Sequence, residues 1–364
     1  MAYTLPPLMI GEDLTIPVPI IQGGMGVKVS MMPLVSAVAD CGGAGTIASV
    51  GLGFGTEGYE KNFVVASRES LITEIRKGRD MTKGVIGANV MVALSNYEDL
   101  VRASVCEQID FIASGAGLPF KLPEYTEGST VKLIPIVSSA RAAHMIIKTW
   151  KRRYNRVPDA FIVEGPLAGG HLGFSYDDIV SGTAPSLESL VGDMVALCAD
   201  YTGKNGKPIP VIAAGGVYTG TDIANFLRLG AQGVQMGTRF VATVECPVHH
   251  NFKMLYCNAT EDDVVIIKSP VGMPGRAVKT KFIDEIERGT TIPFQCLYRC
   301  LRSCDPTTVP YCIAKALTTA LSGDLDNAVV FAGANVARIT DIVPVPDLME
   351  RLIAEATETL SRQP

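Results

Sequence analysis

Short apolar runs alternate with helical patterns along this chain of 364 residues, and eight such runs stand out. They are rich in Val, Ile and Ala without strict polar–apolar alternation, which is typical of strands buried on both faces of a parallel sheet. We predict strands at Val18–Gln22, Ala44–Ala48, Val85–Val92, Ile109–Ala113, Val131–Val137, Ala160–Val163, Pro210–Ala214 and Gly233–Met236. A strand-then-helix unit repeated eight times favours an α/β fold of the closed (β/α)8 or TIM-barrel type, with an open doubly wound sheet as the alternative.

Helical patterns fill the intervals between these strands. They cover Met31–Cys41, Ser67–Lys77, Asn96–Glu107, Ala140–Tyr154, Ser186–Tyr201 and Gly220–Leu229. After the eighth strand the pattern changes, and five prolines fall between Glu245 and Thr308. We interpret residues 1–244 as the barrel and residues 245–307 as an excursion that covers its mouth. Residues 308–364 are expected to pack back on the barrel, with helices at Thr308–Ser322 and Val345–Ser361.

Charge and composition argue against several classes of function. The net charge is −5, from 32 basic and 37 acidic residues, so nothing favours nucleic acid or an anionic membrane as a partner. The one basic run, Lys148–Arg156, is interpreted as a solvated helix end. No apolar run reaches the roughly 18 residues that span a bilayer, and the N-terminus lacks the features of a signal peptide. The nine cysteines are odd in number and scattered, which favours a cytoplasmic chain with reduced thiols.

Glycine-rich turns follow the last two predicted strands. Gly215 and Gly216 come after the seventh strand, and Gly237 comes after the eighth, about 20 residues further on. A residue without a Cβ lets backbone N–H groups close on phosphate oxygens, and the loops after strands seven and eight of such a barrel commonly bind phosphate. Two such turns in this order predict a site for a phosphate-bearing cofactor more strongly than one glycine-rich loop would.

Two earlier strands carry further candidates. Gly23 and Gly24 follow the first strand, where adjacent glycines either let the backbone approach a flat ligand or form only a tight turn. Asn89 is a polar side chain within an apolar strand, so it needs a hydrogen-bonding partner. It either bonds the ring edge of a cofactor or is a neutral amide of the core.

His171 is the candidate catalytic residue. Of the four histidines, it alone stands in a glycine-rich loop at a strand end. His144 lies in an apolar helix pattern, and His249 and His250 lie in the excursion. An imidazole titrates near neutral pH, so it can take a proton from a carbon acid or return one to a carbanion. A structural, hydrogen-bonded histidine is the alternative; metal ligation is less favoured, because no second ligand stands at a suitable spacing.

Five motifs together carry a resemblance. They are Gln22-Gly-Gly-Met25, Gly87-Ala-Asn89-Val-Met91, Glu164-Gly-Pro-Leu-Ala-Gly-Gly-His171, Ala213-Ala-Gly-Gly216 and Gly237-Thr-Arg-Phe240. In this order the chain resembles the nitronate monooxygenase (2-nitropropane dioxygenase) family, whose superfamily includes the flavin-dependent enoyl-ACP reductases. The resemblance runs from about Pro17 to Phe240 and resumes at Ser269-Pro-Val-Gly-Met-Pro-Gly-Arg276-Ala.

The resemblance implies a barrel that binds FMN, with His171 as the catalytic residue. The phosphate would rest on the glycine turns after strands seven and eight, and the flavin ring would lie over the turn after strand one. The implied cofactor-binding residues are Gly23, Gly24, Met25, Asn89, Glu164, Gly169, Gly170, Gly215, Gly216, Gly237 and Thr238. A small-molecule substrate is implied, and NAD(P)H is a possible reductant. A homo-oligomer is possible.

Two mechanisms compete within this superfamily. In the first, His171 removes the proton next to a nitro group, and FMN oxidises the nitronate with oxygen as acceptor. In the second, a nicotinamide reduces FMN, and hydride passes to an activated alkene such as an enoyl thioester on an acyl-carrier protein. That acidic partner needs a basic docking patch, for which Arg299 and Arg302 are candidates. A non-catalytic flavin- or phosphate-binding barrel, and a phosphosugar barrel without flavin, are the remaining alternatives.

The excursion departs from the family pattern in its cysteines. Cys296, Cys300 and Cys304 recur every four residues, so we predict one stripe on a helix that ends at Asp305-Pro306, with Cys312 eight residues on. No metal site is predicted, although these four thiols are weak candidates for zinc or an iron–sulfur cluster. Buried structural thiols and a regulatory disulfide are the alternatives.

Overall fold

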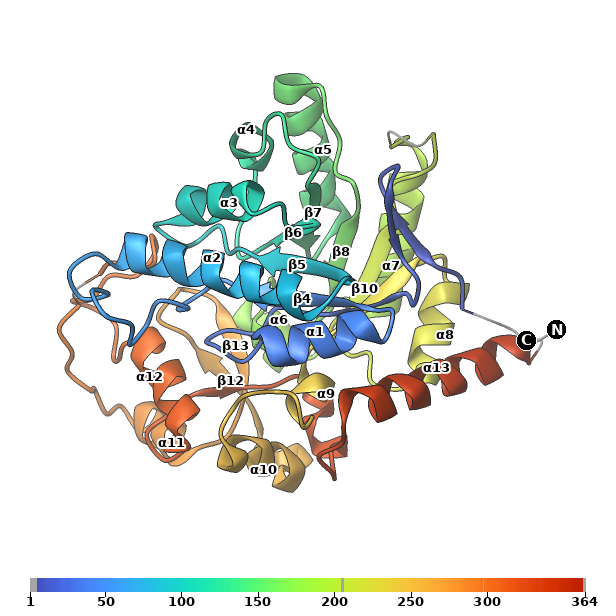
Figure 1. Cartoon of the computed structure of the whole chain (residues 1–364). Helices are drawn as coiled ribbons and strands as arrows, with labels where there is room; N and C mark the ends of the chain where they lie inside the picture. Colours follow the sequence, from blue (N-terminus) through green and yellow to red (C-terminus); the bar gives the residue numbers. More distant parts are fainter. Residues whose placement is uncertain (1–4, 204–205, 297, 363–364) are drawn as a thin grey trace.

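The computed structural model describes residues 5–203, 206–296 and 298–362. Within them, eight parallel strands close into a barrel in the order β10–β11–β3–β4–β5–β6–β7–β8, which confirms the predicted barrel over the open sheet (Figure 1). The strands are β3 (Ile20–Gln22), β4 (Ala44–Ala48), β5 (Val85–Asn89), β6 (Phe111–Ser114), β7 (Lys132–Val137), β8 (Phe161–Glu164), β10 (Val211–Ala214) and β11 (Gly233–Met236). Each overlaps one predicted strand.

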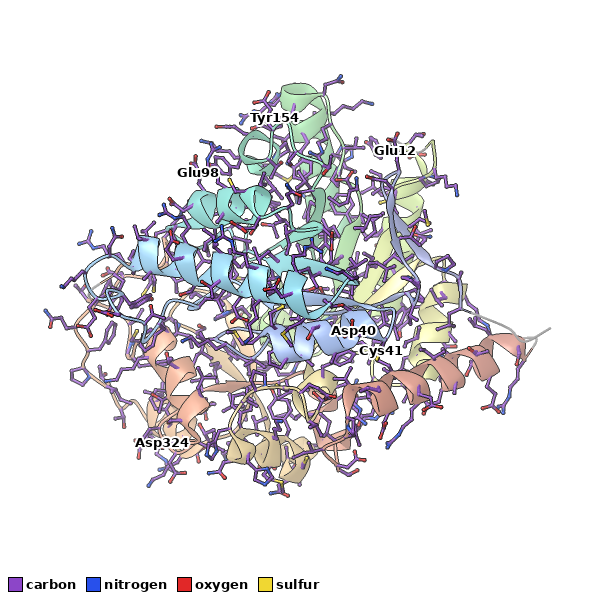
Figure 2. The ribbon with its side chains drawn as sticks, viewed as in Figure 1. Glu12, Asp40, Cys41, Glu98, Tyr154 and Asp324 are labelled. Atoms are coloured by element: carbon purple, nitrogen blue, oxygen red, sulfur yellow. The ribbon has the colours of Figure 1, made fainter. Side chains whose placement is uncertain are left out.

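The barrel wall is apolar on both faces, as the sequence pattern indicates. Every residue of β4, β6 and β10 is buried. Ile21, Phe111 and Ile212 belong to a cluster that fills the barrel, whereas Ile20 and Ile47 belong to the larger cluster between the strands and the surrounding helices. The charged side chains Glu12, Glu98 and Asp324 lie at the outer surface (Figure 2).

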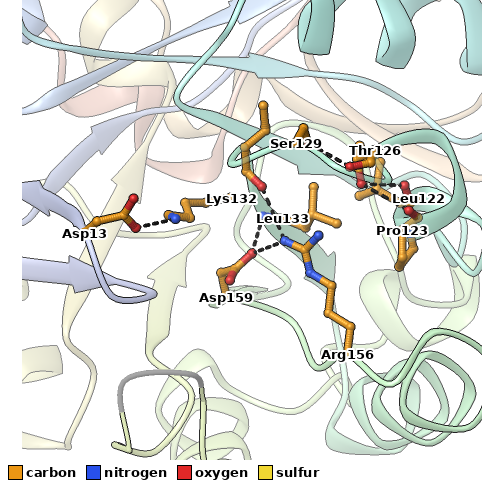
Figure 3. A network of polar contacts seen from close by, with 10 residues as sticks. Asp13, Leu122, Pro123, Thr126, Ser129, Lys132, Leu133, Arg156 and Asp159 are labelled. Carbon is orange, nitrogen blue, oxygen red and sulfur yellow. Dashed lines mark hydrogen bonds and ion pairs between the residues drawn. The ribbon is translucent and has the colours of Figure 1, made fainter.

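An N-terminal hairpin, absent from the sequence prediction, joins the barrel core. Its antiparallel strands are β1 (Leu8–Ile10) and β2 (Leu14–Ile16), and Leu8, Ile10 and Ile16 pack with the residues that fill the barrel. Asp13, in the hairpin turn, forms an ion pair with Lys132 at the start of β7 (Figure 3). The hairpin therefore closes the end of the barrel at which the strands begin.

The same end holds a polar network around Asp159 (Figure 3). One carboxylate oxygen accepts hydrogen bonds from the Leu133 backbone N–H at 2.8 Å and from Arg156 at 2.7 Å. The Arg156 guanidinium also donates to the Val131 carbonyl at 3.3 Å. These bonds join the end of the helix after β7 to the start of β7 itself.

Helices surround the barrel at the predicted places. They are α1 (Met32–Asp40), α2 (Phe63–Met81), α3 (Tyr97–Cys106), α5 (Ala140–Tyr154), α7 (Leu187–Ala199) and α8 (Gly220–Arg228), with shorter helices α4 (Leu122–Tyr125), α6 (Tyr176–Val180) and α9 (Thr238–Val241). Helix α2 begins four residues before its predicted start, because the Asn62 side chain caps it by accepting a hydrogen bond from the Val65 N–H. Helix α13 (Val345–Ser361) packs along α8 (Figure 1).

The elements between α9 and α13 form what we call the covering layer, residues 245–344. It contains α10 (His250–Asn258), β12 (Val264–Lys268), β13 (Pro274–Val278), α11 (Lys281–Glu287), α12 (Ile313–Thr319) and β14 (Val330–Phe331), with 3-10 turns at Glu261–Asp263, Ala320–Ser322 and Ala334–Arg338. Strand β13 pairs with β12, with β14 and with β9 (Gly170–His171), a short strand that follows β8. The layer thus contains the predicted excursion, residues 245–307, together with α12 and β14.

The predicted helix through the cysteines is wrong. Among the described residues between 290 and 312 there is no helix, and Arg299 has a left-handed φ of 46°. Leu301 instead forms an antiparallel bridge with Leu94. The Ser95 N–H donates to the Cys300 carbonyl at 3.0 Å, and the Arg302 N–H donates to the Ala93 carbonyl at 2.9 Å. Pairing with the loop after β5 thus replaces intrahelical hydrogen bonds.

None of the helices in the described part of the chain has both the length and the apolar character needed to cross a membrane.

Candidate active site

A cavity of about 310 Å³ lies between the carboxyl ends of the strands and the covering layer. Active sites of this barrel type form at this end, because the loops after the strands meet there. Every residue predicted to bind the cofactor, together with His171, lines the cavity. The fold therefore brings together candidates that are spread from residue 23 to residue 238.

The glycine cradle, our name for Gly215, Gly216 and Gly237, forms one wall. Gly215 and Gly216 have φ angles of +83° and +119°, which L side chains rarely adopt. A Cβ on Gly215 would also lie 2.9 Å from the Gly165 carbonyl oxygen. Thr238 follows the cradle, and its hydroxyl accepts a hydrogen bond from the Gly333 N–H at 2.8 Å. This wall offers closely packed backbone of the kind that suits a phosphate group.

The turn after β3 forms the floor of the cavity. A Cβ on Gly24 would lie 2.4 Å from the Cβ of Asn89, so only glycine allows the two segments to approach this closely. The Ser30 hydroxyl holds the turn by accepting a hydrogen bond from the Met25 N–H at 2.9 Å. The Asn89 carbonyl accepts from Ser49, and its side-chain amide has no hydrogen-bonding partner among the described residues. That amide faces the cavity.

Two buried polar atoms that line the cavity lack a partner in the described structure. They are Oε1 of Gln235, on β11, and Nη1 of Arg239, on α9. A buried polar group without a partner destabilises a fold by about 1–3 kcal/mol, so both atoms fit a ligand that supplies the missing contacts. The Arg239 guanidinium also lies 5.4 Å from the Tyr218 ring centroid and forms an ion pair with Asp341 at 3.8 Å; in the sequence, Arg239 directly follows Thr238. The sequence prediction assigned neither residue.

His171 is held by the covering layer. Its strand β9 pairs with β13, with His171 opposite Gly275. Its Nε2 lies 2.7 Å from the Ser269 hydroxyl, and its ring centroid lies 4.9 Å from that of Phe331, edge to face. Burial lowers the pKa of His171 to about 4, so the imidazole is neutral at neutral pH. Ser269 stands in a quoted motif, but sequence reasoning gave it no role, because its contact with His171 spans 98 residues.

The loop that leads to His171 depends on Arg276, a residue of β13. The Arg276 guanidinium donates to the carbonyl oxygens of Pro166 and Ala168, at 2.5 and 2.7 Å. Its side chain is buried, and desolvation lowers its pKa. No carboxylate of the described residues forms an ion pair with it. Its contacts are the loop carbonyls, so its role within the described structure is to hold that loop.

Glu164 ends β8 and faces the same cavity as His171. Its carboxyl group makes no hydrogen bond or ion pair with the described residues. Burial raises the pKa of Glu164 to about 7, so the group is partly protonated at neutral pH. The cavity thus contains a carboxyl group that is protonated in part of the molecules and an imidazole that is neutral, which is an arrangement suited to proton transfer.

The four cysteines of the excursion come together near the cavity. Cys300 lines it, and all nine cysteines of the chain are free thiols. Burial, with smaller contributions from Cys312, Cys296 and Cys304, raises the pKa of Cys300 to about 11. Within the described ranges, no three His, Cys, Asp or Glu side chains are placed to hold a metal ion.

These features fit a phosphorylated flavin. The cradle and Arg239 suit the phosphate, the flat glycine turn suits a ring system, and Asn89 and Gln235 offer hydrogen-bonding groups to it. Comparison with known proteins agrees with this reading. The sequence model of the nitronate monooxygenase family matches residues 9–114 and 95–355.

Two relatives illustrate the range of similarity. A (3aS,4S,5R,7aS)-5-hydroxy-7a-methyl-1-oxo-octahydro-1H-indene-4-carboxyl-CoA dehydrogenase from Mycobacterium tuberculosis is 31% identical over 274 residues, which cover 75% of this chain and 66% of the relative. The match therefore spans just under two thirds of that relative. A probable nitronate monooxygenase from Staphylococcus saprophyticus is 27% identical over 302 residues, covering 75% of this chain and 79% of the relative.

Solved structures show the same architecture. FabK from Thermotoga maritima superposes with a TM-score of 0.74 at 28% identity, covering 95% of this chain and 94% of that one. Nitroalkane oxidase from Streptomyces ansochromogenes has a TM-score of 0.74 at 21% identity, covering 95% and 97%, and at that identity it supports the fold alone. On the match of the family sequence model, the chain belongs to the nitronate monooxygenase family of oxidoreductases.

Proposed function

We propose that this protein is an FMN-dependent oxidoreductase that oxidises alkyl nitronates. The observation that carries the proposal is the neutral His171, placed in the same cavity as the glycine cradle. FMN, when bound, supplies the acceptor for two electrons and passes them to oxygen. The probable nitronate monooxygenases among the relatives support the same substrate class.

His171 is suited to accept a proton from a carbon next to a nitro group, which turns a neutral nitroalkane into the nitronate that is then oxidised. A nitronate supplied as such has already lost this proton, so the proposed base acts on the nitroalkane form. Within the described residues, its Nδ1 has no hydrogen-bonding partner, whereas Nε2 contacts the Ser269 hydroxyl. A proton taken up on Nδ1 leaves Nε2–H free to donate to Ser269, which keeps the ring in place during transfer. A buried, neutral imidazole needs no prior loss of a proton to act as a base at neutral pH.

Reduction of an activated alkene by NAD(P)H through FMN is the second candidate. The specific observation in its favour is Glu164, whose pKa of about 7 lets it hold the proton that a product carbanion needs. The CoA thioester named for the relative from Mycobacterium tuberculosis supports a thioester substrate. Arg299 and Arg302 are exposed, as docking of an acidic carrier protein requires.

Anaerobic mixing separates these functions. The purified protein, reconstituted with FMN, is mixed with propyl-2-nitronate, with NADH or NADPH, and with crotonyl-CoA after reduction. Bleaching of the flavin by the nitronate, without a response to nicotinamide, is expected. Bleaching by nicotinamide, followed by reoxidation with crotonyl-CoA, would favour the alkene reductase. A bound flavin that responds to none of them would favour a non-catalytic protein, and failure to bind FMN would contradict both activities.

A further inference from the structure

We propose that the cavity has an apolar arm that binds the hydrocarbon part of the substrate, so that the natural substrate carries an extended chain or ring on its reacting carbon. The arm is lined by Phe54, Tyr59, Phe63, Leu94, Ile313 and Leu317. This inference rests on the proposed function, because it names the kind of substrate that the same site takes.

The arm lies across the barrel mouth from the glycine cradle. Around the closed barrel, β5 stands four places from β10 in either direction. The arm is built over β4 and β5, by the loop and helix start after β4 and by the loop after β5. The cradle follows β10 and β11. When a ligand is held at the cradle, the opposite side of the barrel mouth therefore stays available for part of the substrate.

Charge is distributed unevenly around the cavity. Among the described lining residues, Glu164 and Arg239 are the only acidic or basic side chains apart from the neutral His171. They come from β8 and from the residues after β11, on the cradle side of the barrel. The arm thus has no charged group to hold a carboxylate, a phosphate or an ammonium ion, and its lining favours hydrocarbon.

Helix α12 supplies one wall of the arm with a single face. Its lining residues Ile313, Ala314, Leu317 and Thr318 are spaced as neighbours on one side of a helix. Lys315, between them in sequence, is exposed. The orientation of α12 therefore makes Ala314 a position from which a larger side chain enters the arm, and Lys315 a position from which it does not.

An aromatic contact joins the two sides of the arm. The Tyr298 ring centroid, in the covering layer, lies 4.7 Å from that of Tyr59 and 6.0 Å from that of Phe63. Phe54 extends the cluster, at 5.4 Å from Tyr59. Such pairs are stabilising beyond the burial of their area. The same part of the covering layer also pairs, through backbone hydrogen bonds of residues 300–302, with residues 93–95 in the loop after β5. Tyr298 is therefore placed to hold the arm closed over a chain from the side of β4.

The experiment measures binding of straight-chain alkanoates with four, eight and twelve carbons to the FMN-reconstituted protein. A carboxylate resembles a nitronate in shape and charge but does not react. Flavin absorbance or calorimetry gives the Kd. Each buried methylene is expected to tighten binding about fourfold, so Kd falls steeply between four and eight carbons in the wild type. A Kd that does not depend on chain length would overturn the inference.

Two pairs of variants locate the effect. Ala314→Phe is expected to fill the arm and abolish the dependence on chain length, whereas Lys315→Phe, with the same ring on the exposed side of α12, keeps it. Tyr298→Ala is expected to weaken binding of the twelve-carbon ligand at least tenfold more than that of the four-carbon ligand, and Tyr298→Phe restores it. If Ala314→Phe fails to fold, the comparison of Tyr298→Ala with Tyr298→Phe still tests whether the arm binds the chain. If Kd depends on chain length in both Ala314→Phe and Tyr298→Ala as it does in the wild type, the hydrocarbon chain binds outside the arm and the inference is wrong.

Failure of the apolar arm and failure of the proposed function give different results. Turnover of propyl-2-nitronate without dependence of binding on chain length would contradict the apolar arm alone. Dependence on chain length, with no oxidation or reduction of any tested substrate, would contradict the proposed function alone.

Discussion

Burial shifts the pKa values of Glu164 and His171, which both line the cavity, in opposite directions. The pKa of Glu164 rises to about 7, and that of His171 falls to about 4, because desolvation disfavours the charged form of each. His171 is therefore neutral near pH 7, whereas Glu164 is about half protonated, so a fraction of the molecules holds both the neutral base and the protonated acid. A pair separated in this way is the usual mark of an acid and a base in one site.

Replacing His171 by Ala is expected to leave FMN bound and to reduce kcat with a neutral nitroalkane, 2-nitropropane, about 100- to 10,000-fold, the usual contribution of a general acid–base group. Steady-state kinetics and the ratio of flavin to protein absorbance provide the measurement. Ser269→Ala, which removes only the hydroxyl at Nε2, should have a smaller effect. Near-native kcat in the His171 variant would exclude His171 as the acid–base group. Loss of bound FMN together with activity would show that His171 has a structural role.

Glu164 gives the apoprotein a definite pH dependence. Its pKa is about 7 in the folded protein, against about 4.3 in an unfolded chain. Between these values the folded state holds a proton that the unfolded state has lost. This contribution to stability is therefore fully present below about pH 4.3 and is lost as the pH rises through about 7.

The test compares the wild type with Glu164→Gln, whose side chain does not titrate. The difference in free energy of unfolding, wild type minus variant, is expected to fall with rising pH across this window and to stay constant above it. Urea unfolding of the apoproteins at several pH values gives the difference, in which His171 is common to both. A difference that rises with pH would refute the assigned pKa.

At the scale of elements, the covering layer completes the site. His171 belongs to β9, which has its only described strand partner in β13, and Ser269 comes from the turn between β12 and β13. The barrel alone therefore carries the cradle and the floor, whereas the orientation of the proposed base depends on residues about 100 positions later. Arg276 links the two parts through the Pro166 and Ala168 carbonyls.

Replacing Arg276 by Met is expected to lower both stability and activity. The variant leaves two carbonyl oxygens without their donor, and a buried unsatisfied polar group costs about 1–3 kcal/mol. Denaturant unfolding and kcat measure the two effects. Arg288→Met is the matched control, because that side chain is exposed and has no proposed role. Equal stability and kcat in the two variants would show that Arg276 does not hold the loop.

Across the whole molecule, the sequence predicts well those features that depend on residues close together in the chain. The barrel follows from periodicity within each run, and the glycine turns and His171 follow from residue type at strand ends. The hairpin β1–β2 was missed because strands of three residues carry little pattern. The helix through Cys300 was wrongly predicted because spacing does not reveal the pairing with residues 93–95.

The missed site residues share the same physical cause. Ser269 and Arg276 act on a loop about 100 residues earlier, so no local spacing marks them. Gln235 and Arg239 stand in or beside a motif, but their unpartnered atoms are visible only once the surrounding residues are placed. The signal available in the sequence is a polar residue in an apolar or glycine-rich stretch, which identifies Asn89; Glu164 is named only because the family resemblance implies it.

The identity of the cofactor is a prediction about the whole chain. The glycine cradle is the one wall of the cavity that we propose for a phosphate, and the described residues form one barrel with its covering layer, without a second α/β unit that would bind an adenosine. No Gly-x-Gly-x-x-Gly turn opens a βαβ unit with an acidic residue about 20 positions on. FMN, and not FAD, is therefore expected to copurify with the protein. Mass spectrometry of the chromophore released by heat decides between them, with Arg239→Met as a variant expected to weaken FMN binding because it removes the cation that directly follows Thr238 in the sequence. Release of FAD, or undiminished FMN affinity in that variant, would count against this assignment of the phosphate wall.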